Sequence, residues 1–406
     1  MISVEEALER ILSRVSVLGA ERVELPRALA RVLAADVTST SDVPPWANSS
    51  MDGYAVRSVD TREASASSPV RLRRVGSLGA GAVAERPLEA REAYRIFTGA
   101  PLPAGADAIV PQEEVTAEGE SCRIGRPVQA GEFVRSRGED IRAGETVLTS
   151  GRRLRAADMG LLATLGQLQV SVVRRPRVAV LSTGDELADL GAPLGPGQIR
   201  NSNTYSLMAQ LAEAGADAVN LGVAPDRRQD IEQRLRAALG CDGVISSAGV
   251  SVGEHDFVKA ALSDLGAEQH LWQVNMRPGK PIAFATLPAA SKGALPVFAL
   301  PGNPVSAMVT FELFVRPAIL RMGGRARIDR PRATARALAP IPNPGPRRGY
   351  LRVTLVEESG TYGARLTGDQ GSGILRSMVA ADGLAVVPGD TTIEPGQPVT
   401  VLLLRD

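Results

Sequence analysis

The chain has 406 residues, and its 46 Lys and Arg are balanced by 45 Asp and Glu, which leaves a net charge of +1. This balance argues against a chain that coats nucleic acid or an anionic membrane, and an aromatic share of 3% leaves few stacking platforms for single-stranded nucleic acid. Two cysteines and two histidines argue against a disulfide framework and a His/Cys zinc site. No apolar run reaches about 18 residues, so we expect a cytoplasmic protein of about three or four domains that does not span a membrane.

The chain opens on an amphipathic helix. Ser3 and Glu6 have the spacing of a capping box, and apolar residues recur at helical spacing up to Val15. At residue 43 the pattern changes to short apolar runs broken by Gly and Pro, which predicts β structure up to residue 149. Helical spacing returns at residues 156–165. We therefore predict a helical domain of residues 1–42 and 150–176, interrupted by an inserted β domain of residues 43–149.

Strand and helix patterns alternate through residues 177–326. Strands are predicted at residues 178–181, 218–223, 243–246, 282–285 and 297–300, and helices at 203–214, at 231–239 and from Asn303 onward. At this last helix start, Asn303 occupies the N-cap and Pro304 the first turn. The alternation predicts a doubly wound parallel sheet with helices on both faces. Alternating strands at 351–356, 384–387 and 399–404 predict a C-terminal β domain of residues 327–406, so the fold class is multidomain α/β plus β.

Four loops that follow predicted strands carry acidic residues or glycine turns, and ligands of such sheets lie beyond the carboxyl ends of the strands. They are residues 182–186, Pro225-Asp226, 242–256 and 300–304. In the third loop, Gly249 and Gly253 let backbone N–H groups point at an anion, as phosphate loops do. Carboxylates repel phosphate by about 4 kcal/mol at ~4 Å, so the pattern favours a divalent cation between them. The alternative for the first two loops is an ordinary turn and a helix cap.

Other stretches could either bind a ligand or have a purely structural role. The turn at residues 276–281 presents Arg277 and Lys280, which could neutralise phosphate or an oxyanion, or could simply face solvent. Residues 198–203 offer Arg200 and amide donors, or form a helix cap. Asp52-Gly53, within residues 44–55, could belong to a functional loop or to a hairpin turn.

Taken in order, these motifs resemble the molybdopterin molybdenumtransferases of the MoeA type, which are related to the C-terminal domain of gephyrin. The resemblance rests on residues 44–55, 98–108, 112–114, 137–141, 182–187, 198–203, 246–256, 278–281 and 300–306. It implies a four-domain subunit that forms a homodimer. It also implies a reaction in which adenylylated molybdopterin and molybdate react with the help of Mg²⁺, so that molybdenum is inserted and AMP is released.

The resemblance also implies roles for individual residues. The catalytic set would be Asp52, Thr98, Asp140, Glu186, Asp226 and Asp256, of which Glu186, Asp226 and Asp256 would hold Mg²⁺. Asp52, Thr98 and Asp140 would reach the cleft from a partner subunit. The substrate-binding set would be Gly249, Ser251, Gly253, Arg277, Lys280, Pro301, Gly302, Asn303, Pro304, Arg352 and Ser372.

Three positions depart from the family pattern, and two other functions stay open. Ala47 lies where aspartate is common, Ala248 replaces a glycine, and Gln273 occupies a place where lysine occurs. If residue 248 needs a positive φ, Ala248 restricts the backbone. The alternatives are molybdopterin adenylyl transfer and a gephyrin-like scaffold that binds peptides. A molybdopterin adenylyltransferase is also an expected partner, and the metal oxyanion could be molybdate or tungstate.

Overall fold

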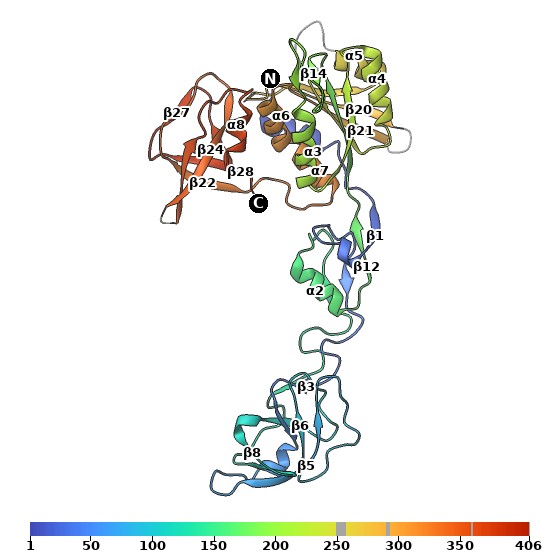
Figure 1. The fold of residues 1–406 in the computed structure, drawn as a ribbon, viewed down its shortest axis with the longest axis vertical. Coiled ribbons are helices and arrows are strands. Elements are labelled where there is room, and N and C mark those ends of the chain that lie inside the picture. Colours follow the sequence, from blue (N-terminus) through green and yellow to red (C-terminus); the bar gives the residue numbers. More distant parts are fainter. Residues whose placement is uncertain (249–256, 290–292, 359, 406) are drawn as a thin grey trace. The chain divides into compact units, whose positions relative to one another are not determined.

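The structure is a computed structural model that describes residues 1–248, 257–289, 293–358 and 360–405. The chain divides into two compact units, each considered by itself below (Figure 1). The first unit holds Met1–Ala34, Gly151–Met159 and Gln169–Asp406, and the second holds Ala35–Ser150 and Gly160–Leu168. Among the described residues, no helix has the length and apolar character needed to cross a membrane.

The second unit is built on a six-stranded sheet in the order β7-β4-β6-β5-β9-β8. The strands are β4 (Gly53–Val56), β5 (Val70–Leu78), β6 (Glu92–Ile96), β7 (Ala108–Pro111), β8 (Val115–Glu118) and β9 (Ser121–Ile124). Two short pairs join β2 (Val37–Thr38) to β11 (Thr146–Leu148) and β3 (Asn48–Ser49) to β10 (Val134–Arg135). Because β3 pairs with β10 while β4 pairs with β6 and β7, the hairpin interpretation of Asp52-Gly53 is wrong.

The N-terminal segment contributes to two places in the first unit. Helix α1 (Val4–Leu12) begins where the capping box predicts, since the Ser3 Oγ accepts from the Glu6 N–H at 3.0 Å. Its buried face joins the core of the α/β sheet described next. Strand β1 (Ala20–Glu24) pairs with β12 (Gln169–Val173), and a 3-10 turn (Leu25–Arg27) follows β1. Helix α2 (Ala156–Thr164) precedes β12 in the chain. The β1–β12 pair brings the two predicted helical pieces together, and the division into four domains stays a prediction.

The α/β body contains a six-stranded sheet in the order β16-β13-β17-β21-β20-β18. Its strands are β13 (Arg177–Thr183), β16 (Asp217–Ala224), β17 (Gly243–Ser247), β18 (Glu268–Gln273), β20 (Pro281–Ala289) and β21 (Gly293–Leu300). The strands β16, β13, β17 and β21 run parallel to one another, whereas β20 runs antiparallel to both of its neighbours, β21 and β18. The sheet is therefore mixed rather than wholly parallel. Only residues 290–292 separate β20 from β21, and a parallel crossover needs about a dozen residues or more.

Alternate residues of β13 pack on opposite faces of this sheet. Val178 and Val180 join the core under α1, α3 (Asn203–Glu213), α6 (Pro304–Thr310) and α7 (Arg316–Met322), with a π-turn (Phe311–Val315) between α6 and α7. Ala179 and Leu181 join the core under α4 (Arg228–Ala237) and α5 (Phe257–Asp264). Both faces are thus covered by helices, as the apolar runs of the strands predict.

The C-terminal strands close into a ring. The strands are β22 (Arg332–Ala337), β24 (Arg348–Glu358), β25 (Thr361–Leu366), β26 (Gly383–Val387) and β28 (Pro398–Leu403). The sheet order β24-β25-β22-β28-β26 is completed by a further pairing of β26 with β24. Shorter elements lie beside the ring: β19 (Met276–Arg277), β23 (Ile341–Asn343), β27 (Thr391–Ile393) and α8 (Leu375–Val379).

Candidate active site

A cleft of about 610 Å³ lies where β13, β17 and β21 end. These strands are parallel neighbours, so their carboxyl ends meet at one edge of the sheet, where α/β proteins bind ligands. The lining comes from these strand ends, from the segment before α3, from the turn before α6 and from the C-terminal domain. It comprises Thr183, Glu186, Leu187, Ile199, Arg200, Asn201, Ser202, Asn203, Ser247, Ala248, Gly302, Asn303, Pro304, Gly373 and Leu375.

The loop after β13 folds so that Glu186 lies at the cleft. Gly184 has a φ of +144°, a backbone conformation that residues with a side chain rarely adopt, so the loop favours glycine here. Short strands β14 (Leu187–Ala188) and β15 (Ile199–Arg200) then pair, and Arg200 donates to the carbonyl oxygens of Asp189 and Ala192. Arg200 therefore holds its own loop together.

Three acidic residues, Asp185, Glu186 and Asp226, interact at the ends of β13 and β16. The Asp226 N–H donates to the Asp185 Oδ1 at 3.2 Å. Burial raises the pKa of Asp226 above its usual range, and the negative charges of Asp185 and Glu186 raise it further. Such mutual repulsion is what a bound cation would relieve. Among the described residues, no three side chains of the metal-binding types form a ready ligand set.

A buried polar network fixes the segment before α3 to the end of β13. The hydroxyl groups of Ser182 and Thr204 lie 2.7 Å apart, and the Asn201 Nδ2 donates to the Thr204 Oγ1 at 2.9 Å. Asn203, at the start of α3, donates to the Ser247 Oγ and the Gly302 carbonyl oxygen. The sequence predicted only a helix cap or amide donors at residues 198–203. It gave no sign of the contacts of Asn203 with Ser247 and Gly302, which lie 44 and 99 residues further along the chain.

The turn before α6 forms another wall of the cleft. Asn303 has the extended backbone of an N-cap and Pro304 opens the helix, as predicted, but the Asn303 side chain makes no capping hydrogen bond. The Val305 N–H instead donates to the carbonyl oxygen of Ser372 at 3.1 Å. This bond joins the α/β body to the loop that carries Gly373 and Leu375 to the cleft. Gly302, Asn303 and Pro304 thus line the cleft, whereas Pro301 is buried behind them.

Arg352 supports the same loop from inside the barrel. Its side chain is 0% exposed, its Nε donates to the Ser377 Oγ at 3.0 Å and its Nη2 to the Gly371 carbonyl oxygen at 3.1 Å. Burial lowers the pKa of Arg352 to about 10. The structure places this guanidinium behind the loop rather than among the lining residues, and its substrate contact stays a prediction.

Arg277 and Lys280 lie on the segment that leads into β20. The Arg277 Nη1 donates to the carbonyl oxygen of Pro344 at 3.2 Å, and the Lys280 carbonyl oxygen accepts from the Val274 N–H. Neither residue lines the cleft. The predicted residues Gly249, Ser251, Gly253 and Asp256 lie outside the described residues.

The remaining predicted residues belong to the second unit. The Thr98 N–H and Oγ1 both donate to the Asp52 Oδ1 at 2.8 Å, and these bonds hold the pKa of Asp52 below its usual range. The two loops that carry Asp52 and Thr98 are therefore fixed to each other. Asp140 lies on a separate loop, where its N–H donates to the Val43 carbonyl oxygen at 3.0 Å.

The three departures from the family pattern lie in different environments. Ala248 has a φ of +78°, so the restriction expected for a residue with a side chain does apply. Gln273 is half-buried at the end of β18, opposite Pro281. The Ala47 carbonyl oxygen accepts from the Leu102 N–H in the second unit.

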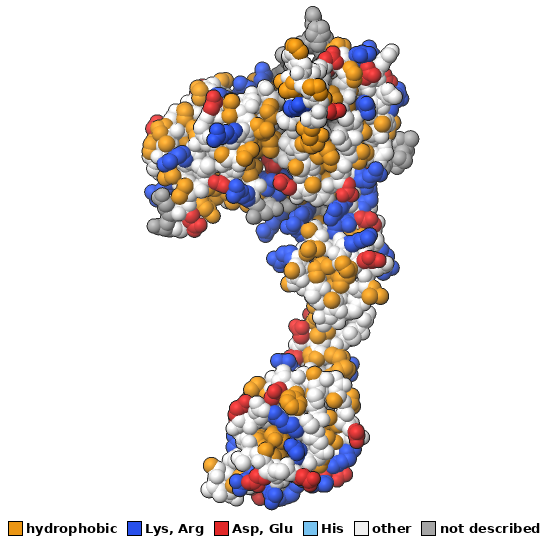
Figure 2. Space-filling model, viewed as in Figure 1, with side chains coloured by type: hydrophobic (Ala, Val, Ile, Leu, Met, Phe, Trp, Pro, Cys, Tyr) orange, Lys and Arg blue, Asp and Glu red, His pale blue; other side chains and the backbone are white. Residues whose placement is uncertain are grey.

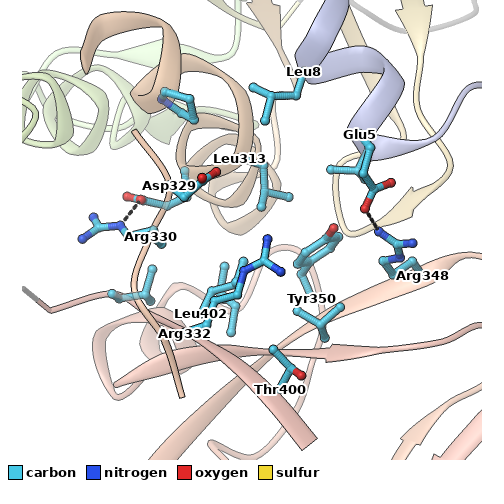
Figure 3. A pocket seen from close by; sticks show the side chains of 16 residues that line it. Glu5, Leu8, Leu313, Asp329, Arg330, Arg332, Arg348, Tyr350, Thr400 and Leu402 are labelled. Atoms are coloured by element: carbon cyan, nitrogen blue, oxygen red, sulfur yellow. Dashed lines mark hydrogen bonds and ion pairs between the residues drawn. The ribbon is translucent and has the colours of Figure 1, made fainter. Parts of the chain in front are cut away.

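Two further hollows of the first unit lack the glycine turn and strand ends of the cleft. One, of about 250 Å³, separates α1 from the barrel; there Glu5 pairs with Arg348, and Arg330 pairs with Glu312 at 2.8 Å (Figure 3). The other, of about 590 Å³, lies beside β1, where arginine side chains gather (Figure 2). Its arginines Arg31 and Arg174 are paired with Glu21 and Asp242.

Comparison with known families covers most of the chain. Residues 2–166 match the MoeA N-terminal region (domain I and II), residues 179–321 match a probable molybdopterin binding domain, and residues 334–404 match the MoeA C-terminal region (domain IV).

Individual relatives match over the full length. The molybdopterin molybdenumtransferase of Nostoc is 40% identical over 100% of this chain and 94% of its own, and that of Bacillus subtilis is 37% identical over the same shares. A crystal structure of the molybdopterin biosynthesis MoeA protein from Pyrococcus horikosii has a TM-score of 0.86 at 34% identity and covers 100% of both chains. The fold, the matched regions and these relatives together show that the chain belongs to the MoeA family of molybdopterin molybdenumtransferases.

Proposed function

We propose that the protein inserts molybdenum from molybdate into adenylylated molybdopterin, with Mg²⁺-dependent cleavage of the adenylate and release of AMP, in the cytoplasm. The observation that carries this proposal is the group of Asp185, Glu186 and Asp226 at the edge of the sheet that also bears the cleft, where burial and then the two neighbouring negative charges raise the pKa of Asp226. The names of the full-length relatives support the same activity.

Magnesium suits this donor set because carboxylate oxygens are the ligands it prefers, and because Asp226 lacks a cationic partner among the described residues. Glu186 and Asp226, together with Asp256, would hold the ion. When bound, it would neutralise charge that develops on the pyrophosphate during cleavage.

The other residues of the cleft would bind and orient the substrate. The rigid turn of Pro301, Gly302, Asn303 and Pro304 lets the substrate approach the backbone closely, and we assign the same role to Gly249, Ser251 and Gly253. Arg277 and Lys280 would neutralise the oxyanion portions of the substrates. Arg352 and Ser372 would act from the barrel, where Arg352 holds the loop and Ser372 binds the start of α6.

We further propose that the active enzyme is a homodimer. In this proposal Asp52, Thr98 and Asp140 complete the cleft of a partner subunit, and a molybdopterin adenylyltransferase supplies the adenylylated substrate. The bonds that join Asp52 to Thr98 support this role, because they hold two loops in a fixed arrangement before any partner binds.

The decisive experiment incubates the purified protein with adenylylated molybdopterin, Mg²⁺ and either molybdate or tungstate, and measures AMP and active cofactor. We expect AMP only when a metal oxyanion is present. Comparison of the incubation with molybdate and the incubation with tungstate gives the preferred metal. Formation of adenylylated molybdopterin from ATP and molybdopterin would instead favour adenylyl transfer. A peptide-binding protein that releases no AMP would favour the scaffold.

Variants test the roles of the acidic residues. Asp226→Asn and Asp256→Asn should abolish AMP release while substrate binding remains detectable, because only the metal ligand is lost. Glu213→Gln is the matched control. Glu213 is an exposed acidic residue at the C-terminal end of α3, away from the cleft, so this variant should keep full turnover. Unchanged turnover in Asp226→Asn would refute its role as a metal ligand.

A further inference from the structure

We propose that Asn203 binds an uncharged hydrogen-bond donor of the substrate through its side-chain oxygen, while its side-chain nitrogen holds two walls of the cleft together. The donor would be an N–H or O–H group of the pterin or of the adenosine, not of the oxyanion portions. This inference rests on the proposed function, because it takes adenylylated molybdopterin as the ligand.

The side chain of Asn203 connects the start of α3 to the end of β17 and to the turn after β21. The residue begins α3 and is only 9% exposed. Its Nδ2 donates to the Ser247 Oγ at the end of β17, at 2.8 Å, and to the Gly302 carbonyl oxygen after β21, at 2.7 Å. A single amide group therefore fixes the spacing of the cleft walls.

The chemistry of Gly302 fixes the orientation of this amide. A carbonyl oxygen only accepts hydrogen bonds, so the nitrogen of Asn203 and not its oxygen must face Gly302. Both amide hydrogens are then used. The Oδ1 atom is buried and has no hydrogen-bond partner among the described residues.

Buried acceptors without a partner are costly in folded proteins, and each needs an explanation. Side-chain oxygens of Asn48, Gln210 and Asn343 share this condition, but none of these three residues lines the cleft. Asn203 does line it. A ligand in the cleft can therefore supply the missing donor at Asn203, which it cannot do at the other three positions.

The identity of the donor follows from the parts of the proposed substrate. Pyrophosphate and molybdate oxygens are acceptors at neutral pH, and a carbonyl oxygen beside them repels them. The pterin and the adenosine carry N–H and O–H donors. The Asn203 oxygen would thus favour one organic end of the substrate and exclude the charged portion, which sets the direction in which the substrate lies.

The test measures the affinity for molybdopterin and for AMP in separate titrations, with Asn203→Ala and with Asn203→Ser. The serine keeps a small polar side chain at this position but has neither the amide nitrogen nor the amide oxygen. We expect both variants to weaken binding of one of the two ligands by about tenfold, because a hydrogen bond to a buried acceptor is lost, and to leave the other ligand within a factor of about two.

Gln210→Ala is the matched control. Gln210 lies on the same helix, is buried, donates to the Met308 carbonyl oxygen and to Glu312, and also has a side-chain oxygen without a partner. The Gln210→Ala variant should lower the midpoint of thermal unfolding about as much as the Asn203 variants do, without changing the affinity for molybdopterin or for AMP. Unchanged affinities in both Asn203 variants, or equal weakening by Gln210→Ala, would overturn the proposal.

The titrations also separate this inference from the proposed function. If the native protein releases no AMP but its binding of molybdopterin or AMP depends on Asn203, only the proposed function fails. If AMP is released with molybdate and binding does not depend on Asn203, only the present inference fails.

Discussion

Replacing Ala248 by glycine should stabilise the protein. Ala248 has a φ of +78°, and its N–H donates to the Leu300 carbonyl oxygen at 3.1 Å, which fixes this conformation beside the cleft. A residue with a Cβ in the left-handed region costs about 1–2 kcal/mol, and glycine costs about 0.5–1 kcal/mol in additional chain entropy on folding. Taken at the midpoints of these ranges, the difference predicts a net gain of about 0.75 kcal/mol.

Thermal unfolding provides the assay. A gain of this size should raise the midpoint of the unfolding transition by about 1–4 °C for a unit of this length. Ala30→Gly is the first control, because Ala30 also has a positive φ, of 64°, but lies outside the cleft. Ala380→Gly is the second, because its φ of −81° gives glycine no advantage, so this midpoint should fall. If Ala248→Gly lowers the midpoint as Ala380→Gly does, the argument from backbone strain is wrong.

Two further predictions concern charged groups. Because the pKa of Asp226 is raised by burial and by Asp185 and Glu186, the native state holds its proton more tightly than the unfolded state, and the ionised carboxylate costs stability above that pKa. Asp226→Asn should therefore raise the unfolding midpoint of the metal-free protein at pH 7–8, and the gain should shrink as the pH falls through the raised pKa; a gain that persists in acid would contradict this cause. Asp242→Ala should destabilise the first unit by about 3 kcal/mol, measured by urea unfolding, because the Asp242 side chain is 1% exposed and binds Arg174 through both carboxylate oxygens. A loss below about 1 kcal/mol would mean that the pair is solvated.

Elements with strong apolar patterns were predicted correctly, and weakly patterned ones were missed. The strands β13 and β17 carry continuous apolar runs and were found from sequence. Strands β22 and β25 were missed because Arg, Ala and Thr dominate them and few of their side chains are buried. The antiparallel direction of β20 was also missed, since strand direction depends on the length of the connection and not on the pattern within the strand.

The candidate site was predictable where a local motif carries it. Glu186 and residues 302–304 follow strands directly, and the rule that ligands lie at strand ends was sufficient to place them. Asn203 was not predicted because its partners Ser247 and Gly302 are far away in sequence, so that a lone asparagine at a helix start resembles a cap. Contacts of this kind depend on tertiary packing and leave no local pattern.

The closed ring of β24, β25, β22, β28 and β26 limits how other proteins could bind the C-terminal domain. Each of these five strands bonds two neighbours within the ring, and β24 also pairs with the short strand β19, so none of the five is an open edge strand. An extended peptide therefore finds no open edge on the ring, and a binding partner of the ring would have to recognise side chains or loops. The same closure protects the domain against the edge-to-edge association that open sheets risk.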